Sequence, residues 1–127
     1  MLKNIHHIAI ICSQYEVSKA FYTEVLGLEI LQETFRAERD SYKLDLGLNG
    51  QYMVELFSFP TPPIRPSHPE AVGLRHLAFE VEDIEKMRDY LTSKNIEVEP
   101  IRTDELTGKK FTFISDPDLL PIEFYEE

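Results

Sequence analysis

The sequence predicts an α+β protein made of two tandem βαβββ modules, and an internal repeat is the first observation behind that prediction. Residues 6–12, HHIAIIC, recur at residues 75–81 as RHLAFEV, so a short apolar run beginning at a histidine occurs twice. A shift of 69 residues places His7 on His76. The second observation is that both halves continue in the same way, with a helical pattern followed by segments in which apolar and polar residues alternate.

The two halves are separated by a proline-rich segment. Residues 60–70, PTPPIRPSHPE, contain five of the eight prolines and cannot form a helix or a central strand, because proline lacks the N–H that either structure needs. We therefore expect one domain over residues 1–127, with the first module at 1–59, a linker at 60–71 and the second module at 72–127. The linker could also lie over a site as a semi-rigid flap.

The first half begins with an apolar run at 5–12, which favours a strand buried on both faces. Ser13 and Glu16 have the spacing of a capping box, and Gly27 stands where a left-handed helix cap belongs, so we expect a helix of about three turns between them. Three strand-like segments follow at 28–35, 41–48 and 51–59, and the last two are joined by a hairpin turn at Asn49–Gly50.

The second half repeats this plan. A strand is expected at 73–81, and a helix that starts from an Asp83 cap and carries Ile84, Met87 and Leu91 on one face. Further strands are expected near 96–101, 109–115 and 121–126, with a turn at Asp116-Pro117-Asp118 before the last.

Composition limits the partners and the location of the protein. The net charge of −10 disfavours nucleic acid, which needs a basic face, but allows a small anionic substrate held by local arginines. No apolar run is long enough for a membrane span, and the N-terminus does not resemble a signal peptide. The single cysteine, Cys12, fits a reducing compartment. We therefore expect a cytoplasmic protein without a membrane partner.

The repeated histidines and glutamates are the candidate site. A glutamate within a strand more often lies on a solvated face, and a lone histidine is more often structural, so these readings stay open. His7 is equivalent to His76 at a shift of 69 residues, and after a one-residue deletion near Gly27 and Asn95 the shift becomes 68 and Glu55 is equivalent to Glu123. This equivalence suggests that related modules could bring all four residues to one centre. Two nearby carboxylates repel, and a divalent cation is the usual way to offset that repulsion. Such a site would keep one or two positions for water or substrate.

The segments HHIAI, FYTEVLGLEI, VELF, RHLAFEVED and DPDLLPIEFYE resemble the vicinal oxygen chelate superfamily, and within it the glyoxalase I-like proteins, particularly the small bacterial YaeR-type members. The resemblance covers residues 4–126 and implies paired βαβββ modules whose curved sheets enclose a divalent metal. It places the metal ligands at His7, Glu55, His76 and Glu123. It also implies that Glu123 is the first choice for the base that moves a proton and Glu55 the second.

The resemblance further implies a metal-dependent lyase or isomerase that acts on a small molecule, with the two oxygens of an α-hydroxycarbonyl or a ketoaldehyde–thiol adduct chelated by the metal. Ni²⁺ or Co²⁺ is favoured for short bacterial chains, with Zn²⁺, Mn²⁺ and Fe²⁺ as alternatives. Related proteins pair modules across subunits, so a homodimer is expected, with the site formed within one chain or across two.

The same resemblance leaves other functions open. Glutathione-dependent glyoxalase I has an arginine and an asparagine at positions where this chain has Ile11 and Phe59. These two apolar residues weaken the case for a glutathione adduct as the substrate. The scaffold is also similar to ring-cleaving dioxygenases, fosfomycin thiol transferases and methylmalonyl-CoA epimerase. However, the first two use three protein ligands, and the epimerase has glutamine at one ligand position. Drug-sequestering relatives bind small molecules without a metal.

Several other polar residues are weighed as contributors. Strand alternation predicts that His6 points away from His7 and that Arg75 points away from His76. His68 lies in the linker and is expected to be solvated. An anion clamp for a substrate carboxylate could come from the basic residues Arg36, Arg39, Arg65, Arg102, Lys109 and Lys110.

Overall fold

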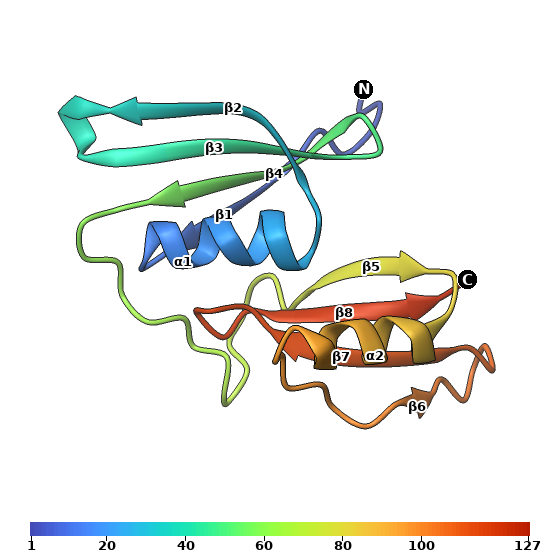
Figure 1. The fold of residues 1–127 in the computed structure, drawn as a ribbon. Coiled ribbons are helices and arrows are strands. Elements are labelled where there is room, and N and C mark those ends of the chain that lie inside the picture. The colour runs from blue at the N-terminus through green and yellow to red at the C-terminus, as the bar shows by residue number, and fades with distance from the viewer. The chain divides into compact units, whose positions relative to one another are not determined.

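Two four-stranded sheets, each with its own helix, make up the computed structural model, which describes all 127 residues (Figure 1). The chain divides into two units, Met1–Ile64 and Arg65–Glu127, called unit 1 and unit 2 below. The predicted α+β fold of two tandem βαβββ modules is therefore confirmed. None of the helices has the length and apolar content needed to cross a membrane.

Unit 1 contains a mixed sheet with the strand order β1-β4-β3-β2, in which β1 and β4 are parallel and the other neighbours antiparallel. The helix α1 continues directly into one π-helical turn, so together they span the three turns expected. The elements are β1 (Ile8–Cys12), α1 (Tyr15–Ala20), η1 (Phe21–Val25), β2 (Glu29–Arg36), η2 (Ala37–Arg39), β3 (Ser41–Leu48) and β4 (Gln51–Ser58).

Unit 2 has the same topology, with the strand order β5-β8-β7-β6 and a parallel pair formed by β5 and β8. The internal repeat in the sequence is thus a repeat of the whole strand–helix–strand arrangement. The elements are β5 (Leu77–Val81), α2 (Ile84–Ser93), β6 (Arg102–Thr103), β7 (Lys110–Ser115) and β8 (Pro121–Glu126).

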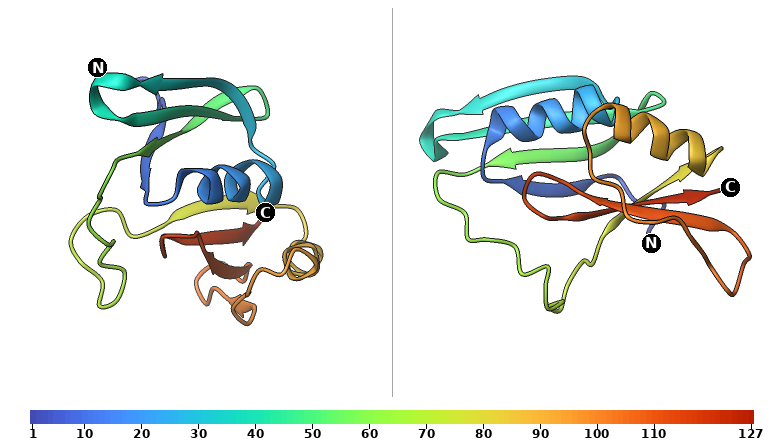
Figure 2. Two further views of the ribbon diagram at one scale, coloured as in Figure 1. Left: turned by 60° about the vertical axis from the view of Figure 1, so that its left-hand side comes forward. Right: turned by 60° about the horizontal axis from the view of Figure 1, so that its bottom comes forward.

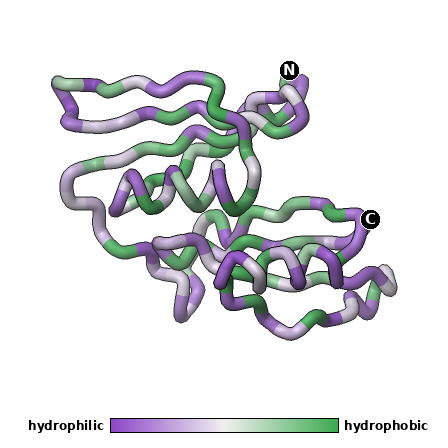
Figure 3. Tube along the Cα trace, viewed as in Figure 1, coloured by the Kyte–Doolittle hydropathy of each residue, from purple (hydrophilic) through white to green (hydrophobic).

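Each helix covers one face of its own sheet (Figure 2). Apolar side chains of the strands are buried on that face. In unit 1, Val54 and Leu56 of β4 are fully buried. In unit 2, Ile122 and Phe124 of β8 are buried in the same way. Hydrophobic and hydrophilic residues alternate along strands such as β3 (Figure 3), whereas β1 is apolar throughout. Because successive strand residues point to opposite faces, the glutamate between each buried pair faces away from the helix.

The predicted turns and caps are largely confirmed. Asn49 and Gly50 both have positive φ, 51° and 78°, as the tight hairpin between β3 and β4 requires. Gly27, with φ of 77°, ends the first helix. The Asp83 carboxylate accepts hydrogen bonds from two backbone N–H groups at the start of α2.

The predicted capping box at Ser13 is wrong, because the N-cap of α1 is Gln14, which makes no side-chain cap hydrogen bond. The strand predicted at 96–101 is also wrong, since only Arg102–Thr103 pairs with β7. Pro100 lacks the N–H that a ladder needs at this position. The segment is still tied to β7 by the Glu99 N–H, which donates to the Phe113 carbonyl at 3.0 Å.

The first strand of each unit begins later than the sequence predicts. β1 starts at Ile8 and β5 at Leu77, so both candidate histidines lie immediately before a strand rather than within it. In addition, β1 is not buried on both faces: Ile10 and Cys12 are buried, whereas Ile11 is 55% exposed. Strand alternation therefore does not govern the directions of the residues that precede β1 and β5.

Candidate functional site

In unit 1, the parallel pairing of β1 with β4 positions His7 beside Glu55. Ala9 lies opposite Glu55 in the register, and His7 is two residues before Ala9. The Nε2 atom of His7 lies 3.6 Å from the Oε2 atom of Glu55.

In unit 2, the same arrangement recurs with equivalent residues. Ala78 of β5 lies opposite Glu123 of β8, and His76 is two residues before Ala78. The Nε2 atom of His76 lies 2.7 Å from the Oε2 atom of Glu123. Both glutamate side chains are mostly buried, at 13% exposure for Glu55 and 14% for Glu123. Both units therefore hold one imidazole nitrogen and one carboxylate oxygen close together on the sheet face that the helix leaves free.

The structure brings together each histidine with the glutamate of its own unit. It contains no group of three or more His, Cys, Asp or Glu side chains arranged to hold a metal ion. A metal centre with all four ligands, His7, Glu55, His76 and Glu123, thus stays a prediction.

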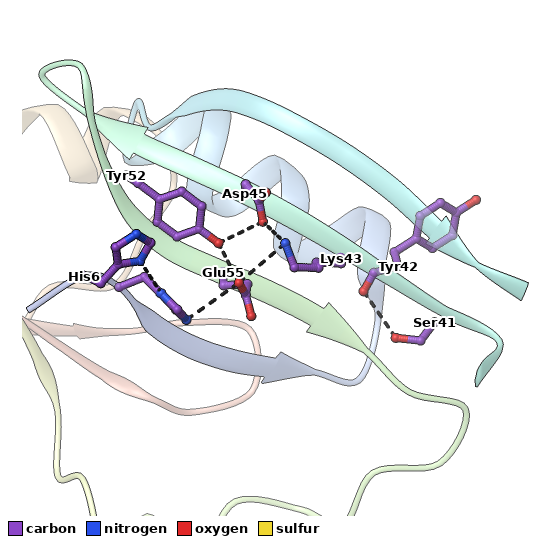
Figure 4. Close-up of polar contacts among 8 residues, drawn as sticks. His6, Ser41, Tyr42, Lys43, Asp45, Tyr52 and Glu55 are labelled. Atoms are coloured by element: carbon purple, nitrogen blue, oxygen red, sulfur yellow. Dashed lines mark hydrogen bonds and ion pairs between the residues drawn. The ribbon is translucent and has the colours of Figure 1, made fainter. Parts of the chain in front are cut away.

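Glu55 belongs to a hydrogen-bonded network of charged and polar side chains (Figure 4). Asp45 of β3 lies directly opposite Glu55. The Tyr52 hydroxyl lies 2.6 Å from Glu55 Oε2 and 2.9 Å from Asp45 Oδ1. The Lys43 ammonium lies 2.7 Å from Asp45 Oδ1 and 3.5 Å from Glu55 Oε2. Lys43 thus offsets the repulsion between two facing carboxylates and, with Tyr52, holds Glu55 in place.

Tyr52 and Lys43 are both in the protonated form that is needed to hold the Glu55 carboxylate. Burial, followed by hydrogen bonds to Glu55 and Asp45, raises the pKa of the Tyr52 phenol. The hydrogen bond to Asp45 raises the pKa of the Lys43 ammonium. Both side chains therefore keep their protons at neutral pH, and Glu55 retains two donors.

His6 also contacts this network, contrary to the prediction that it points away from His7. The Nδ1 atoms of His6 and His7 lie 2.8 Å apart, and the His6 ring lies 5.3 Å from the ring of Tyr52. The prediction is wrong because both histidines precede β1, where strand alternation does not apply. A hydrogen bond on Nδ1 fixes the orientation of the His7 ring and leaves its Nε2 directed to Glu55.

Glu123 has apolar neighbours in place of this network. Phe113 of β7 lies directly opposite Glu123, at the position that Asp45 occupies in unit 1. The rings of His76 and Phe113 meet edge to face, with their centroids 5.2 Å apart. Phe111 stands where unit 1 has Lys43. Within unit 2, His76 is the only hydrogen-bonding or ion-pair partner of the Glu123 carboxylate.

Lys43, Asp45, Tyr52 and Phe113 were not singled out from the sequence. Lys43 and Asp45 alternate with the buried Leu44 and Leu46, which marks them as residues of the face opposite the helix. Only the register of β3 against β4 shows that Asp45 lies opposite Glu55. The sequence shows the alternation of polar and buried residues in β3, but it does not show which residue of β4 lies opposite each of them.

A cavity of about 120 Å³ lies within unit 2, and His76 is part of its wall. Three arginines, Arg65, Arg75 and Arg102, also line it. Arg75, which is predicted to point away from His76, also lines this cavity, and both residues lie immediately before β5. The segment 65–71, from the expected linker, forms part of the wall.

Comparison with known proteins identifies relatives over the whole chain. Residues 4–124 match the family described as Glyoxalase/Bleomycin resistance protein/Dioxygenase superfamily. The uncharacterized protein YwkD of Bacillus subtilis is 65% identical over 100% of this chain and 99% of its own, and the uncharacterized protein YaeR of Escherichia coli is 59% identical over 99% and 98%. A crystal structure of a glyoxalase family protein from Enterococcus faecalis shares 52% identity, covers 98% of both chains and superposes with a TM-score of 0.91.

More distant solved structures share the fold alone. The fosfomycin resistance protein FosX of Listeria monocytogenes, as an E126Q mutant complexed with Mn(II) and a dihydroxypropylphosphonic acid, is 14% identical over 98% of this chain and 93% of its own, with a TM-score of 0.78. The lactoylglutathione lyase of Agrobacterium tumefaciens is 21% identical over 98% of this chain and 94% of its own, with a TM-score of 0.70.

Proposed function

The chain belongs to the glyoxalase/bleomycin resistance protein/dioxygenase superfamily, and from that premise we propose that it is a metal-dependent enzyme whose divalent cation is bound by His7, Glu55, His76 and Glu123. The observation that carries the proposal is the recurrence of one arrangement in both units. In each, a histidine two residues before an alanine presents Nε2 to a glutamate opposite that alanine.

The donor atoms suit such an ion. Imidazole nitrogen and carboxylate oxygen are ligands that Ni²⁺, Co²⁺, Zn²⁺, Mn²⁺ and Fe²⁺ all accept, and the resemblance to short bacterial glyoxalase I-like chains favours Ni²⁺ or Co²⁺. One pair supplies two ligands, which is too few for a stable site. The proposal therefore requires both pairs, from one chain or from two copies in a homodimer. When bound, the ion supplies charge stabilisation for the anion formed when a proton leaves the carbon beside a chelated carbonyl.

The surroundings of the two glutamates support different roles for them. Tyr52 and Lys43 occupy the Glu55 carboxylate, so Glu55 acts as a fixed ligand. The Glu123 carboxylate has no donor other than His76 within its unit, and Phe113 lies opposite it. A carboxylate without competing donors is better able to accept and return a substrate proton. Glu123 is therefore our first choice for the base and Glu55 the second.

The proposed reaction is a lyase or isomerase step that moves a proton next to a chelated carbonyl. An α-hydroxycarbonyl or a ketoaldehyde–thiol adduct supplies the two neighbouring oxygens that such chelation needs. The positions that contact glutathione in glutathione-dependent glyoxalase I hold Ile11, which is 55% exposed, and Phe59, which packs beside Phe57. These apolar side chains favour a thiol other than glutathione, or an adduct without a peptide portion.

Elemental analysis of gently purified protein tests the proposal. Near-stoichiometric Ni, Co, Zn, Mn or Fe is expected in the wild type and is expected to disappear in a His7→Ala/Glu123→Ala double variant. A matched His68→Ala/Glu97→Ala variant, which changes two exposed residues of the same types, should keep the metal. If neither the wild type nor the control holds metal after supplementation, the four-ligand proposal fails. Retention of metal would lead directly to a screen of ketoaldehyde–thiol adducts.

A metal-free binding protein is the second candidate function. It is favoured by the cavity beside His76. Thermal unfolding separates the two functions, since a bound ion stabilises the folded state by mass action. A rise in Tm with Ni²⁺ or Co²⁺ supports the enzyme, and an unchanged Tm with every divalent ion supports the binding protein.

A further inference from the structure

The cavity of unit 2 is lined by more basic than acidic side chains, in a chain whose net charge is −10. Three arginines line it, with only two carboxylates, Glu70 and Glu99, and with His76 of the candidate metal pair. A basic pocket on an acidic protein attracts anions locally while the rest of the surface repels them.

The acidic residues do not neutralise this cavity fully. Arg75 and Glu70 are 4.0 Å apart and Arg102 and Glu99 are 3.3 Å apart, but more than half of each of these side chains is exposed. Exposed ion pairs of this kind are weak and easily exchanged for another anion. Arg65, by contrast, has no carboxylate partner within unit 2.

Two buried nitrogen atoms of residues that line the cavity lack a hydrogen-bond partner. They are the Nε atom of Arg65 and the Nδ1 atom of His76, two of only four such buried side-chain atoms. Buried polar atoms are almost always hydrogen-bonded, so the Nε–H group of Arg65 calls for an acceptor. An anionic oxygen in the cavity would supply it.

The basic groups are held in position before any ligand binds. The Nη2 atom of Arg65 donates to the backbone carbonyls of Leu74 and Arg75 at 2.7 and 3.0 Å. The guanidinium of Arg102 lies over the rings of Phe111 and Phe113, 4.9 and 5.7 Å from their centroids. A guanidinium fixed in this way loses little conformational entropy when it binds an anion.

We propose that this cavity binds the carboxylate or phosphoryl group of an anionic substrate, with Arg65 and Arg102 as the principal donors. The inference rests on the proposed function, because His76 then joins the anion site to the metal site. At about 120 Å³ the cavity is smaller than the roughly 300–1,000 Å³ of a typical pocket for a complete drug-sized ligand. It therefore takes one charged end of the substrate, while the chelating oxygens lie at the metal.

An NMR titration of the metal-free full-length protein tests this site without any turnover. Inorganic phosphate and acetate are added separately, and backbone amide shifts are followed in the wild type and in Arg65→Gln, Arg102→Gln and Arg39→Gln. Arg39 is an exposed arginine of unit 1 and is the matched control. We expect saturable shifts at amides of the cavity wall, and an apparent Kd raised about tenfold in both cavity variants but not in the control.

The two anions distinguish the substrates. Binding of phosphate alone indicates a phosphorylated substrate, and binding of acetate alone indicates a carboxylate. The proposal is overturned if neither anion gives saturable shifts in the wild type, or if all three variants weaken binding equally. Arg102→Gln keeps the test valid if Arg65→Gln unfolds the 74–75 segment. A parallel Ni²⁺ titration of the same proteins separates the two proposals: localised anion binding without Ni²⁺ binding rejects the metal site alone.

Discussion

The His7–Glu55 and His76–Glu123 pairs occupy equivalent positions in two units of the same topology, yet their neighbours differ in chemistry. Facing Glu55 is Asp45, bridged by Lys43, whereas facing Glu123 is Phe113. The contact between imidazole and carboxylate differs too, at 3.6 Å in unit 1 and 2.7 Å in unit 2. The shared topology places the two carboxylates at equivalent positions, and the residue opposite each one on the neighbouring strand determines which groups contact it.

Because of this difference, the two equivalent glutamates are restrained to different degrees. Glu55 is restrained by donors that keep their protons, because the pKa values of Tyr52 and Lys43 are raised. Glu123 is restrained by its histidine alone within unit 2. The two glutamates occupy equivalent positions in the repeat, so the difference between them comes from the residues that surround each carboxylate.

The largest expected effect comes from Glu123→Gln. On the best substrate from the adduct screen, removing the proposed base should lower kcat by about 10²- to 10⁴-fold, because general-base catalysis contributes that much. The fold should persist, as glutamine has nearly the same shape. Glu55→Gln is the comparison, and it should weaken metal retention more than kcat in metal-saturated enzyme. Unchanged kcat in Glu123→Gln would remove it from the role of base.

The next effect concerns the network of unit 1. Asp45→Ala should lower the free energy of unfolding by about 1–3 kcal/mol, because Lys43 and Tyr52 lose a shared, mostly buried acceptor. Urea denaturation measures this loss. Asp89→Ala is the matched control, since its ion pair with Arg88 is largely exposed and should change stability by less than about 0.5 kcal/mol. Equal losses in both variants would contradict a stabilising network.

The helix ends offer a smaller test of the same comparison. Gly27 and Asn95 are equivalent positions that both have positive φ, 77° and 61°. A Cβ added to Gly27 meets nothing within 4 Å, so Gly27→Ala should cost only the backbone strain of about 1 kcal/mol. Asn95→Gly relieves a strained residue and should change stability by a few tenths of a kcal/mol. Urea unfolding of both variants tests this, and a larger loss in Asn95→Gly would show that its side chain matters.

The smallest effect is a pH dependence that comes from one carboxyl group of unit 1, that of Glu33. Lys19, followed by Tyr15, donates hydrogen bonds to Glu33 and lowers the pKa of that carboxyl below 4.5. Because the folded state binds this proton less readily than the unfolded state, the stabilisation is present above pH 4.5 and is lost as the pH falls through the lowered value. Unit 2 has Ile101 at the position equivalent to Glu33.

The measurement for this prediction is the difference in Tm between wild type and Glu33→Gln over a series of pH values. The difference should be small and positive at pH 6 and should shrink below pH 4.5, because Glu33 is exposed. Glu29→Gln, at an exposed glutamate of the same strand, serves as the control. A constant difference at every pH would show that the Glu33 ion pair does not affect stability.

Local signals in the sequence succeeded where one short stretch of chain determines the geometry. Asn49–Gly50 has the conformation of a tight hairpin, and Asp83 caps its own helix. Ser13 is not the N-cap residue, because the helix starts two residues after it, at Tyr15. The strand expected near 96–101 failed because a proline interrupts the ladder, although a hydrogen bond from Glu99 still ties the segment to β7.

By itself the sequence determined that two equivalent halves each carry one histidine and one glutamate, because the repeat and the period of the strands are properties of neighbouring residues. Only the tertiary structure decided that Lys43, Asp45 and Tyr52 hold Glu55, and that Arg65 and His76 line one cavity. Those contacts depend on strand register and on chain segments that meet across a sheet. Register is set by the packing of whole strands, which no single segment of sequence contains.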